Sequence, residues 1–399
     1  MLSPIEKRFP VDVARAMAHD PHGVFARMRE AGPVHTIVAP DGSPAWLVTR
    51  HADVQAALGD PRFSLDKSRA KPGGYKGFEL PPALDANLLN MDPPDHTRLR
   101  RLAGRAFTAR HTANLRPELE RAAAALADDL AARERVDLAR DFATPFAVGA
   151  ISELLGVPAE SRTDFRTWTN AVLGADATRE GIRSTVREMY AFFVALLAAK
   201  RANPGPDLLS ALIAARDADD RLSEDELTSL AFLLLFAGYE NSANLMAGAL
   251  YAMVDDEVLR DALRADPEAV PTLVEEVARH MSPALLAIRR FPLEDLELGG
   301  VTIPAGDTVF LSIAAANRDP RRYPHADRIR LDRPDPARHL SFGQGIHYCI
   351  GAPLARLEGE IAVRTVLTRF PKVRRHGPIS WQPSVRVRGL SSLPVELGG

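Results

Sequence analysis

Apolar side chains recur three and four positions apart over long stretches of this chain, which is the spacing of one face of an α-helix. The longest stretch begins at Ser223, which forms a capping-box pattern with Glu226 three positions later. From there the chain is almost continuously apolar to about Val254, and a helix of that length would extend about 45 Å. Such a helix suits the centre of a large domain. Further helices are predicted at 92–105, 118–135, 143–155 and 271–280, with a broken helical stretch at 165–203.

Shorter segments combine apolar alternation with the turn residues that typically bound β-strands. Strands are predicted at 34–38, 46–49, 296–298, 301–303 and 308–313, and an extended segment with a loop at 389–392 is predicted at 385–396. Residues 64–90 show no steady period, which predicts a long loop of the kind that often covers a binding site. The fold class is therefore mainly α with small β-sheets, an α+β fold. No glycine- or serine-rich linker divides the chain, so residues 1–399 are predicted to form a single domain.

Composition narrows the classes of function that need to be considered. The 50 Lys and Arg residues nearly balance 52 Asp and Glu, for a formal net charge of −2, which argues against a nucleic-acid-binding protein. One cysteine excludes an internal disulfide. The chain contains no run of about 18 apolar residues, so no membrane span is predicted. Because residues 1–20 lack the apolar core of a secretory signal, we expect a cytoplasmic protein.

The single cysteine, Cys349, lies in a segment rich in glycine. Gly343, Gly345 and Gly351 surround it, and Pro353 then marks the start of a helix with apolar residues at helical spacing. Loop amides and the positive end of the helix dipole would both favour a thiolate at this position. The cysteine by itself would favour a reactive or buried thiol in a glycine turn, whereas a thiolate held by amides suits a soft metal ligand.

The residues Phe342, Gly343, Gly345, His347, Cys349 and Gly351 follow the spacing Phe-Gly-x-Gly-x-His-x-Cys-x-Gly. This pattern resembles the haem-binding signature of the cytochrome P-450 family. The resemblance implies haem b as cofactor, with the thiolate of Cys349 as the axial ligand of its iron. It also implies the fold of that family, in which haem lies between the long central helix and the helix that follows the cysteine loop.

Further motifs extend the resemblance over most of the chain from position 92 onward. Glu276 and Arg279 match the family's Glu-x-x-Arg, which locks its helix to the segment before the cysteine loop. The spacing alone would equally fit an exposed ion pair. The resemblance also implies that the haem propionates are bound by His96 and Arg100, which lie four apart on one helix face, and by Arg290 and His347. Arginine suits this role because its guanidinium offers a fork of donors to a carboxylate.

The central helix carries Ala237-Gly238-Tyr239-Glu240-Asn241-Ser242, which resembles the family's oxygen-binding motif Ala-Gly-x-Glu/Asp-Thr. Ala237 and Gly238 are therefore expected at the haem, although Gly238 could equally serve helix packing. Asn241 departs from the motif, because it stands where the family has threonine, and an amide cannot relay a proton as a hydroxyl does. Three readings stay open: Asn241 orients a water molecule, the substrate supplies a hydroxyl, or oxygen activation is poorly coupled. We expect the first, with Glu240 acting through that water and Ser242 nearby but about 100° around the helix.

The resemblance implies a monooxygenase that inserts one oxygen atom from O2 into a largely apolar small molecule, with a role in bacterial secondary metabolism. Pocket residues are expected in segments 73–89, 165–183, 232–241, 283–288 and 390–393. The chain has no dinucleotide fingerprint or cysteine cluster, so electrons are expected from a separate ferredoxin and ferredoxin reductase. The basic residues Arg98, Arg101 and Arg105 would form either a docking patch or a solvated helix face.

Two other functions compete with this one. The departure at Asn241 leaves room for a peroxide-driven or oxidative-coupling haem enzyme, which would need no proton relay. A haem-based sensor or binding protein belongs to a different class of function, and the chain shows no appended signalling domain in its support.

Overall fold

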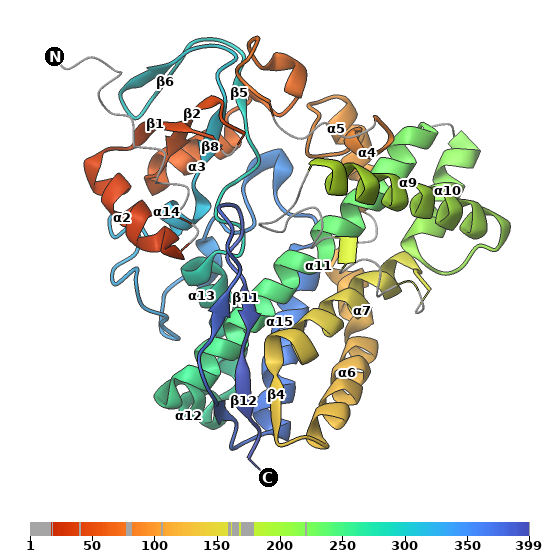
Figure 1. The fold of residues 1–399 in the computed structure, drawn as a ribbon, viewed down its shortest axis with the longest axis vertical. Helices are drawn as coiled ribbons and strands as arrows, with labels where there is room; N and C mark the ends of the chain where they lie inside the picture. Colours follow the sequence, from red (N-terminus) through yellow and green to blue (C-terminus); the bar gives the residue numbers. More distant parts are fainter. Residues whose placement is uncertain are drawn as a thin grey trace.

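The computed structural model describes residues 17–398 apart from 18, 40, 77–81, 105–106, 159–160, 162–166, 169–178 and 220–221. Helix α11 (Glu224–Asp255) crosses the middle of the molecule (Figure 1). Its capping box is present as predicted: the Ser223 hydroxyl accepts a hydrogen bond from the Glu226 amide at 3.0 Å, and the Glu226 carboxylate accepts one from the Ser223 amide at 2.8 Å. This cap fixes the point at which the long helix begins.

The largest hydrophobic core surrounds α11. Helices α7 (Thr144–Leu155), α13 (Val270–Met281) and α15 (Ala352–Arg369) pack against it, and α6 (Ala109–Ala131) packs on α15. The chain also forms α2 (Pro21–Ala31), α3 (His51–Gly59), α4 (Pro82–Asp85), α5 (Asp95–Gly104), α9 (Arg179–Ala202), α10 (Leu208–Asp219), α12 (Glu257–Ala265) and α14 (Ile313–Asn317). Six of these, α2, α3, α4, α10, α12 and α14, were missing from the sequence prediction, and none of the six is longer than the 12 residues of α10.

Short sheets lie outside the helical core. Strand β2 (Pro44–Val48) pairs antiparallel with β1 (Val34–Val38) and parallel with β8 (Val309–Leu311). The residues that pair between β2 and β8, such as Trp46 and Val309, are 263 positions apart. The predicted hairpin is β6 (Leu296–Leu298) with β7 (Val301–Ile303). The remaining strands are β3 (Phe63–Ser64) with β5 (Phe291–Pro292), β4 (Arg135–Asp137) with β12 (Pro394–Glu396) and β9 (Arg374–Arg375), and β10 (Ser380–Trp381) with β11 (Leu390–Ser392).

Three boundaries differ from the prediction. The predicted loop at 389–392 is mostly strand β11, because residues 390 and 392 pair with β10. The helix predicted at 118–135 begins earlier, at Ala109, and ends before β4, whose residues pair with β12 at the C-terminus. The predicted loop at 64–90 contains α4, while its residues 77–81 lie outside the described ranges. Within the described ranges, no helix combines the length and apolarity that a bilayer crossing needs.

Candidate functional site

The loop that carries Cys349 is shaped by backbone geometry that requires glycine. Gly343 and Gly345 have φ angles of 71° and 74°, in the left-handed region that disfavours other residues. The Cys349 amide donates a hydrogen bond to the Phe342 carbonyl at 2.7 Å, which closes the loop. Helix α15 begins directly after it, and Gly351 is its N-cap residue. The glycine spacing of the sequence pattern therefore reflects a tight turn that sets the cysteine at a helix N-terminus.

Two effects act in opposite directions on the Cys349 thiol. Burial raises its pKa, while hydrogen bonds from the amides of Gly351 and Ala352 and the charges of Arg100 and Arg356 act to lower it. Burial is the larger effect, so these groups alone do not produce the thiolate that the sequence led us to expect. The side chain nevertheless retains accessible surface. The Cys349 thiol is surrounded by protein and still has accessible surface, which indicates an internal space beside the sulfur.

A second exposed strip lies in the middle of α11. Ala237 and Asn241 are exposed although most of the helix before and after them is buried. They are four residues apart, hence on one face of the helix. No described side chain covers that face at these two positions. The helix therefore leaves room for a ligand on the side that carries both residues.

The imidazoles of His96 and His347 and the guanidinium of Arg290 form what we call the donor cluster. The two rings lie 4.2 Å apart between centroids, although His96 belongs to α5 and His347 to the cysteine loop. His96 is 1% exposed and Arg290 is 4% exposed. Both ring nitrogens of His96, Nε2 of His347 and Nε of Arg290 have no hydrogen-bond partner among the described residues. Buried polar groups are nearly always paired, so the donor cluster indicates a missing anionic ligand.

Electrostatics support the same conclusion for the donor cluster. Burial lowers the pKa of Arg290 to about 10, with Asp92 acting weakly in the opposite direction. Burial and the neighbouring His96, Arg290 and Arg100 lower the pKa of His347 to about 3. A carboxylate placed among these groups would reverse both shifts, because an opposite charge favours the protonated forms.

Arg100, also predicted to bind a haem propionate, lies beside the donor cluster. Its Nη2 donates a hydrogen bond to the carbonyl oxygen of Tyr348 at 2.5 Å, so its guanidinium lies on the cysteine loop. It is close enough to His347 to lower the pKa of that imidazole. Arg100 thus borders the donor cluster and is bonded to the residue before Cys349.

The predicted oxygen-binding motif on α11 is divided between two faces. A Cβ on Gly238 would lie 2.7 Å from Cγ1 of Ile151 in α7. Packing of α11 against α7 therefore requires glycine there, which is the alternative that the sequence left open. Glu240 is half-buried, and burial raises its pKa to about 7. Ser242 is buried and turned toward Glu358 of α15, away from the exposed strip at Asn241.

Glu358 is an acidic group that the sequence reasoning missed. It lies in the apolar pattern of α15, between Leu354 and Ile361, and it is 0% exposed. Burial raises its pKa to about 8, and a weak contact with the Ser242 hydroxyl acts in the opposite direction. That contact leaves both carboxyl oxygens without a well-formed hydrogen bond in the described structure. A charged residue inside an apolar helical stripe was the sequence signal that could have revealed it.

Glu276, Arg279 and Arg333 form a buried ion network that we call the α13 network. Glu276 and Arg279 are both 0% exposed, so the alternative of an exposed ion pair is wrong. Nε of Arg279 and Nε of Arg333 each lie 2.7 Å from Oε1 of Glu276. Arg279 also donates to the carbonyl oxygens of Asn317, Ala326 and Arg328. The network ties α13 to the chain that leads into the cysteine loop, as the motif implied, and Arg333 could not be anticipated because it lies 57 positions away.

Comparisons with known proteins agree on one family. The family model described as Cytochrome P-450 matches residues 147–376. The chain is 42% identical to cytochrome P-450 107B1 of Saccharopolyspora erythraea, with 96% of each chain covered. It is 41% identical to the mycinamicin IV hydroxylase/epoxidase of Micromonospora griseorubida, with 94% of this chain and 97% of that protein covered.

The chain belongs to the cytochrome P-450 family. Its structure is similar to a crystal structure of myxobacterial cytochrome P-450 CYP267B1 in complex with myristic acid, with a TM-score of 0.91 and 38% identity over 96% of this chain and 98% of that one. The predicted family, the α+β cytochrome P-450 fold, the haem b cofactor with a cysteine thiolate ligand and the monooxygenase activity are thereby confirmed.

The described residues fit the haem of a cytochrome P-450. The chain has one cysteine to supply the thiolate ligand, and its side chain is accessible within the fold. The donor cluster offers unpaired nitrogens that suit two propionate carboxylates. The exposed strip on α11 offers small and polar side chains without any covering group. These three features come from separate segments of the chain. Haem would provide iron for the thiol, carboxylates for the donor cluster and a flat surface for the exposed strip.

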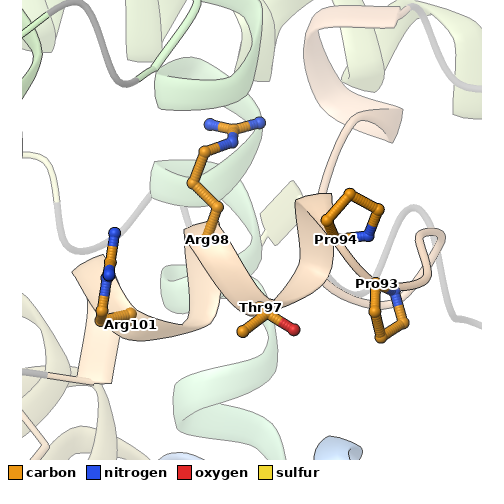
Figure 2. Close-up of a pocket in the computed structure, with 5 residues that line it drawn as sticks. All are labelled: Pro93, Pro94, Thr97, Arg98 and Arg101. Carbon is orange, nitrogen blue, oxygen red and sulfur yellow. The ribbon is translucent and has the colours of Figure 1, made fainter.

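A shallow pocket on this cytochrome P-450 involves two of the arginines predicted to dock an electron donor. It is lined by Pro93, Pro94, Thr97, Arg98 and Arg101, and Figure 2 shows both arginines on one side of α5. Arg98 is bonded to Glu226 of α11, with Nη2 and Oε1 2.5 Å apart, and to Asp95 at 3.0 Å. Arg101 is exposed, and Arg105 lies outside the described residues. Because Arg98 is already paired, Arg101 is the member that offers an exposed charge among the two arginines of the predicted patch that the structure describes.

Proposed function

We propose that Cys349 is the axial ligand of haem in this monooxygenase and that the donor cluster binds the propionates. The unpaired nitrogens of His96, Arg290 and His347 are the observation that carries this proposal. The exposed surface of Ala237 and Asn241 would lie against the opposite side of the ring, while Phe342, Gly343 and Gly351 shape the loop that holds the sulfur. When bound, haem supplies the oxygen-activating chemistry, and the protein supplies binding, orientation and protons.

The ligand assignment is tested by replacing the sulfur with a closely similar group. Wild-type protein, reduced and treated with carbon monoxide, should show the red-shifted Soret band that thiolate ligation produces, and Cys349→Ser should lack it. The paired variant Arg290→Met should retain the band but lose haem faster, because it removes a propionate partner and leaves the sulfur. A red-shifted band that persists in Cys349→Ser would disprove the assignment.

The second part of the proposal concerns protons. Glu240 has a pKa raised to about 7 by burial, so it can hold and release a proton near neutral pH. Asn241 is exposed on the same helix, and its amide can orient a water molecule between Glu240 and the exposed strip. In this arrangement the proton leaves a Glu240 carboxyl oxygen and travels through that water. Ser242 takes no direct part, because it is turned toward Glu358.

Coupling between oxygen consumption and product formation measures the role of Asn241. We expect Asn241→Ala to release more peroxide per product, and Asn241→Thr, which restores the hydroxyl of the family motif, to release no more than wild type. Unchanged coupling in Asn241→Ala would remove this residue from the mechanism. Full turnover with peroxide but none with ferredoxin and reductase would instead select the peroxide-driven alternative, which the asparagine keeps open.

The substrate we propose is a medium-to-large apolar molecule, modified by hydroxylation or epoxidation. Phe232 and Phe236 precede Ala237 on α11 and form an aromatic group with Phe193 of α9. The Phe232 and Phe236 rings are stacked with their centroids 5.3 Å apart. The relatives named for mycinamicin IV and solved with myristic acid support an apolar ligand. Most of the predicted pocket segment at 165–183 lies outside the described residues. A spectral screen with macrolide, fatty-acid, terpenoid, steroid and aromatic libraries tests this class, because binding that displaces an iron ligand shifts the Soret band.

Electron supply completes the proposal. We propose a separate ferredoxin and an NAD(P)H-dependent ferredoxin reductase as donors, in a cytoplasmic protein whose residues 1–399 form one domain. Arg101 then contributes to the docking surface and Arg98 contributes little, because it is paired with Glu226. Arg101→Glu should raise the ferredoxin concentration needed for half-maximal reduction, and Arg98→Gln should change it less. Equal effects of the two variants would contradict this division of roles.

A further inference from the structure

Arg356 of α15 makes contacts that link the cysteine loop to α13. Its Nε lies 2.5 Å from Oε1 of Glu275, and its Nη1 donates to the phenol oxygen of Tyr348 at 3.1 Å. Its guanidinium carbon lies 4.4 Å from the ring centroid of Phe342. The side chain therefore contacts two residues of the loop that closes around Cys349, and it is held there by a carboxylate from another helix.

Glu275 is itself fixed in place. Nε2 of His339 lies 2.8 Å from Oε2 of Glu275, while the other carboxyl oxygen faces Arg356. Burial by itself would raise the pKa of Glu275, but hydrogen bonds from His339 and Arg356 outweigh it and lower that pKa. Glu275 thus stays charged, and it belongs to the same helix as the α13 network. The guanidinium of Arg356 is consequently held by a rigid support.

Tyr348 is held at both ends by arginines. Its phenol oxygen accepts from Arg356, and its carbonyl oxygen accepts from Arg100 at 2.5 Å. Because this carbonyl belongs to the peptide that joins Tyr348 to Cys349, the two contacts limit rotation of the chain next to the sulfur. The charges of Arg100 and Arg356 are also close enough to act on the Cys349 sulfur.

We propose that Arg356 is a positioning residue that sets the reduction potential of the haem bound by Cys349, by fixing the Tyr348–Cys349 peptide and keeping a positive charge beside the sulfur. A nearby positive charge stabilises the reduced state, which carries one electron more, and so raises the potential. The inference rests on the proposed ligation by Cys349. The competing explanation is that Arg356 only fastens α15 to α13, in which case its removal would change stability and leave the potential unaltered.

A redox titration followed by absorbance separates the two explanations. Arg356→Gln should shift the one-electron midpoint potential to more negative values, by roughly a tenfold change in the reduction equilibrium, or about 59 mV. Arg356→Lys keeps the charge and should recover most of that shift. Arg364→Gln is the matched control: Arg364 lies on the same helix, its side chain is also 30% exposed, and it pairs with Glu360 and Glu268, away from the loop. The midpoint potential of the Arg364→Gln variant should equal that of the wild-type protein.

Tyr348→Phe provides an independent test if Arg356→Gln does not fold. It removes only the hydroxyl that accepts a hydrogen bond from Arg356, so we expect a smaller shift in the same direction and an unchanged red-shifted Soret band. A wild-type potential in both Arg356→Gln and Tyr348→Phe, or an equal shift in Arg364→Gln, would overturn the inference. Loss of the red-shifted band from the wild-type protein would instead show that the proposed ligation had failed, so the two failures are distinguishable.

Discussion

The α13 network and the donor cluster are both buried and polar, but they differ in whether their groups are paired. In the α13 network, Glu276 accepts from Arg279 and Arg333, and the remaining donors of Arg279 reach backbone carbonyls. In the donor cluster, His96 and Arg290 are just as deeply buried but retain unpaired nitrogens. Buried polar groups that are paired within the protein stabilise the fold. Buried polar groups that have no partner within the protein indicate where a ligand binds.

Two glutamates extend this comparison to single residues. Glu276 and Glu358 are both 0% exposed. Burial would raise the pKa of either carboxyl, but at Glu276 the hydrogen bonds and charges of Arg279 and Arg333 outweigh it and lower the pKa. At Glu358 only the Ser242 hydroxyl opposes burial, and the pKa rises to about 8. The charge of a buried carboxylate therefore depends on its partners and not on its depth.

Breaking the α13 network should have the largest effect on stability. Arg279→Ala removes one of the two arginines that pair with Glu276, and it leaves three backbone carbonyl oxygens without the donor that Arg279 provides. We therefore expect a loss of about 3–5 kcal/mol in the free energy of unfolding. Urea unfolding of the haem-loaded protein measures this loss. Arg374→Ala, which breaks the exposed pair with Glu396, should leave the midpoint nearly unchanged. Similar losses in both variants would show that burial does not distinguish the two pairs.

Neutralising Glu358 should have the next largest effect, with a defined pH dependence. Burial raises the pKa of Glu358 to about 8 in the folded protein, whereas a solvated glutamate, as in the unfolded chain, has a pKa of 4.5. Between these two pH values the folded protein therefore binds one proton more than the unfolded chain. Wild-type stability should therefore fall as pH rises from about 4.5 to 8. Glu358→Gln should remove this fall and gain on the order of 3 kcal/mol over wild type at pH 7.

Urea midpoints across that pH range check this expectation. Glu360→Gln, two positions along α15 and paired with Arg116 and Arg364, is the control and should keep the wild-type profile. A Glu358→Gln protein with the same pH profile as wild type would mean that Glu358 is charged in the folded state, contrary to the assignment made from its surroundings.

Removing a member of the donor cluster should have the smallest effect on folding, and it should stabilise the haem-free protein. Arg290→Met deletes a buried guanidinium whose Nε has no hydrogen-bond partner among the described residues, so the haem-free protein should become more stable, by about 1–3 kcal/mol. The haem-loaded protein should transfer its haem to apomyoglobin roughly tenfold faster or more, because one charge-assisted contact to a propionate is lost. If the haem-free variant is destabilised like Arg279→Ala, the donor cluster is structural and the comparison fails.

Local patterns in the sequence determined a large part of this protein. The capping box at Ser223, the glycines around Cys349 and the spacing of Glu276 and Arg279 each express a requirement of short chain segments, such as a helix start, a tight turn or a shared helix face. Such requirements can be read without knowing the neighbours. They were sufficient to identify the central helix, the cysteine loop and the family resemblance that the comparisons confirmed.

Tertiary structure decided the properties that depend on residues distant in sequence. Gly238 is required by Ile151, 87 positions away, and strand β4 forms because it pairs with β12 near the C-terminus. Burial raises the pKa of Glu358, whereas two arginines, one of them 57 positions away, lower the pKa of Glu276. Desolvation and ion pairing are set by everything packed around a group, and a linear pattern of residues does not contain that information.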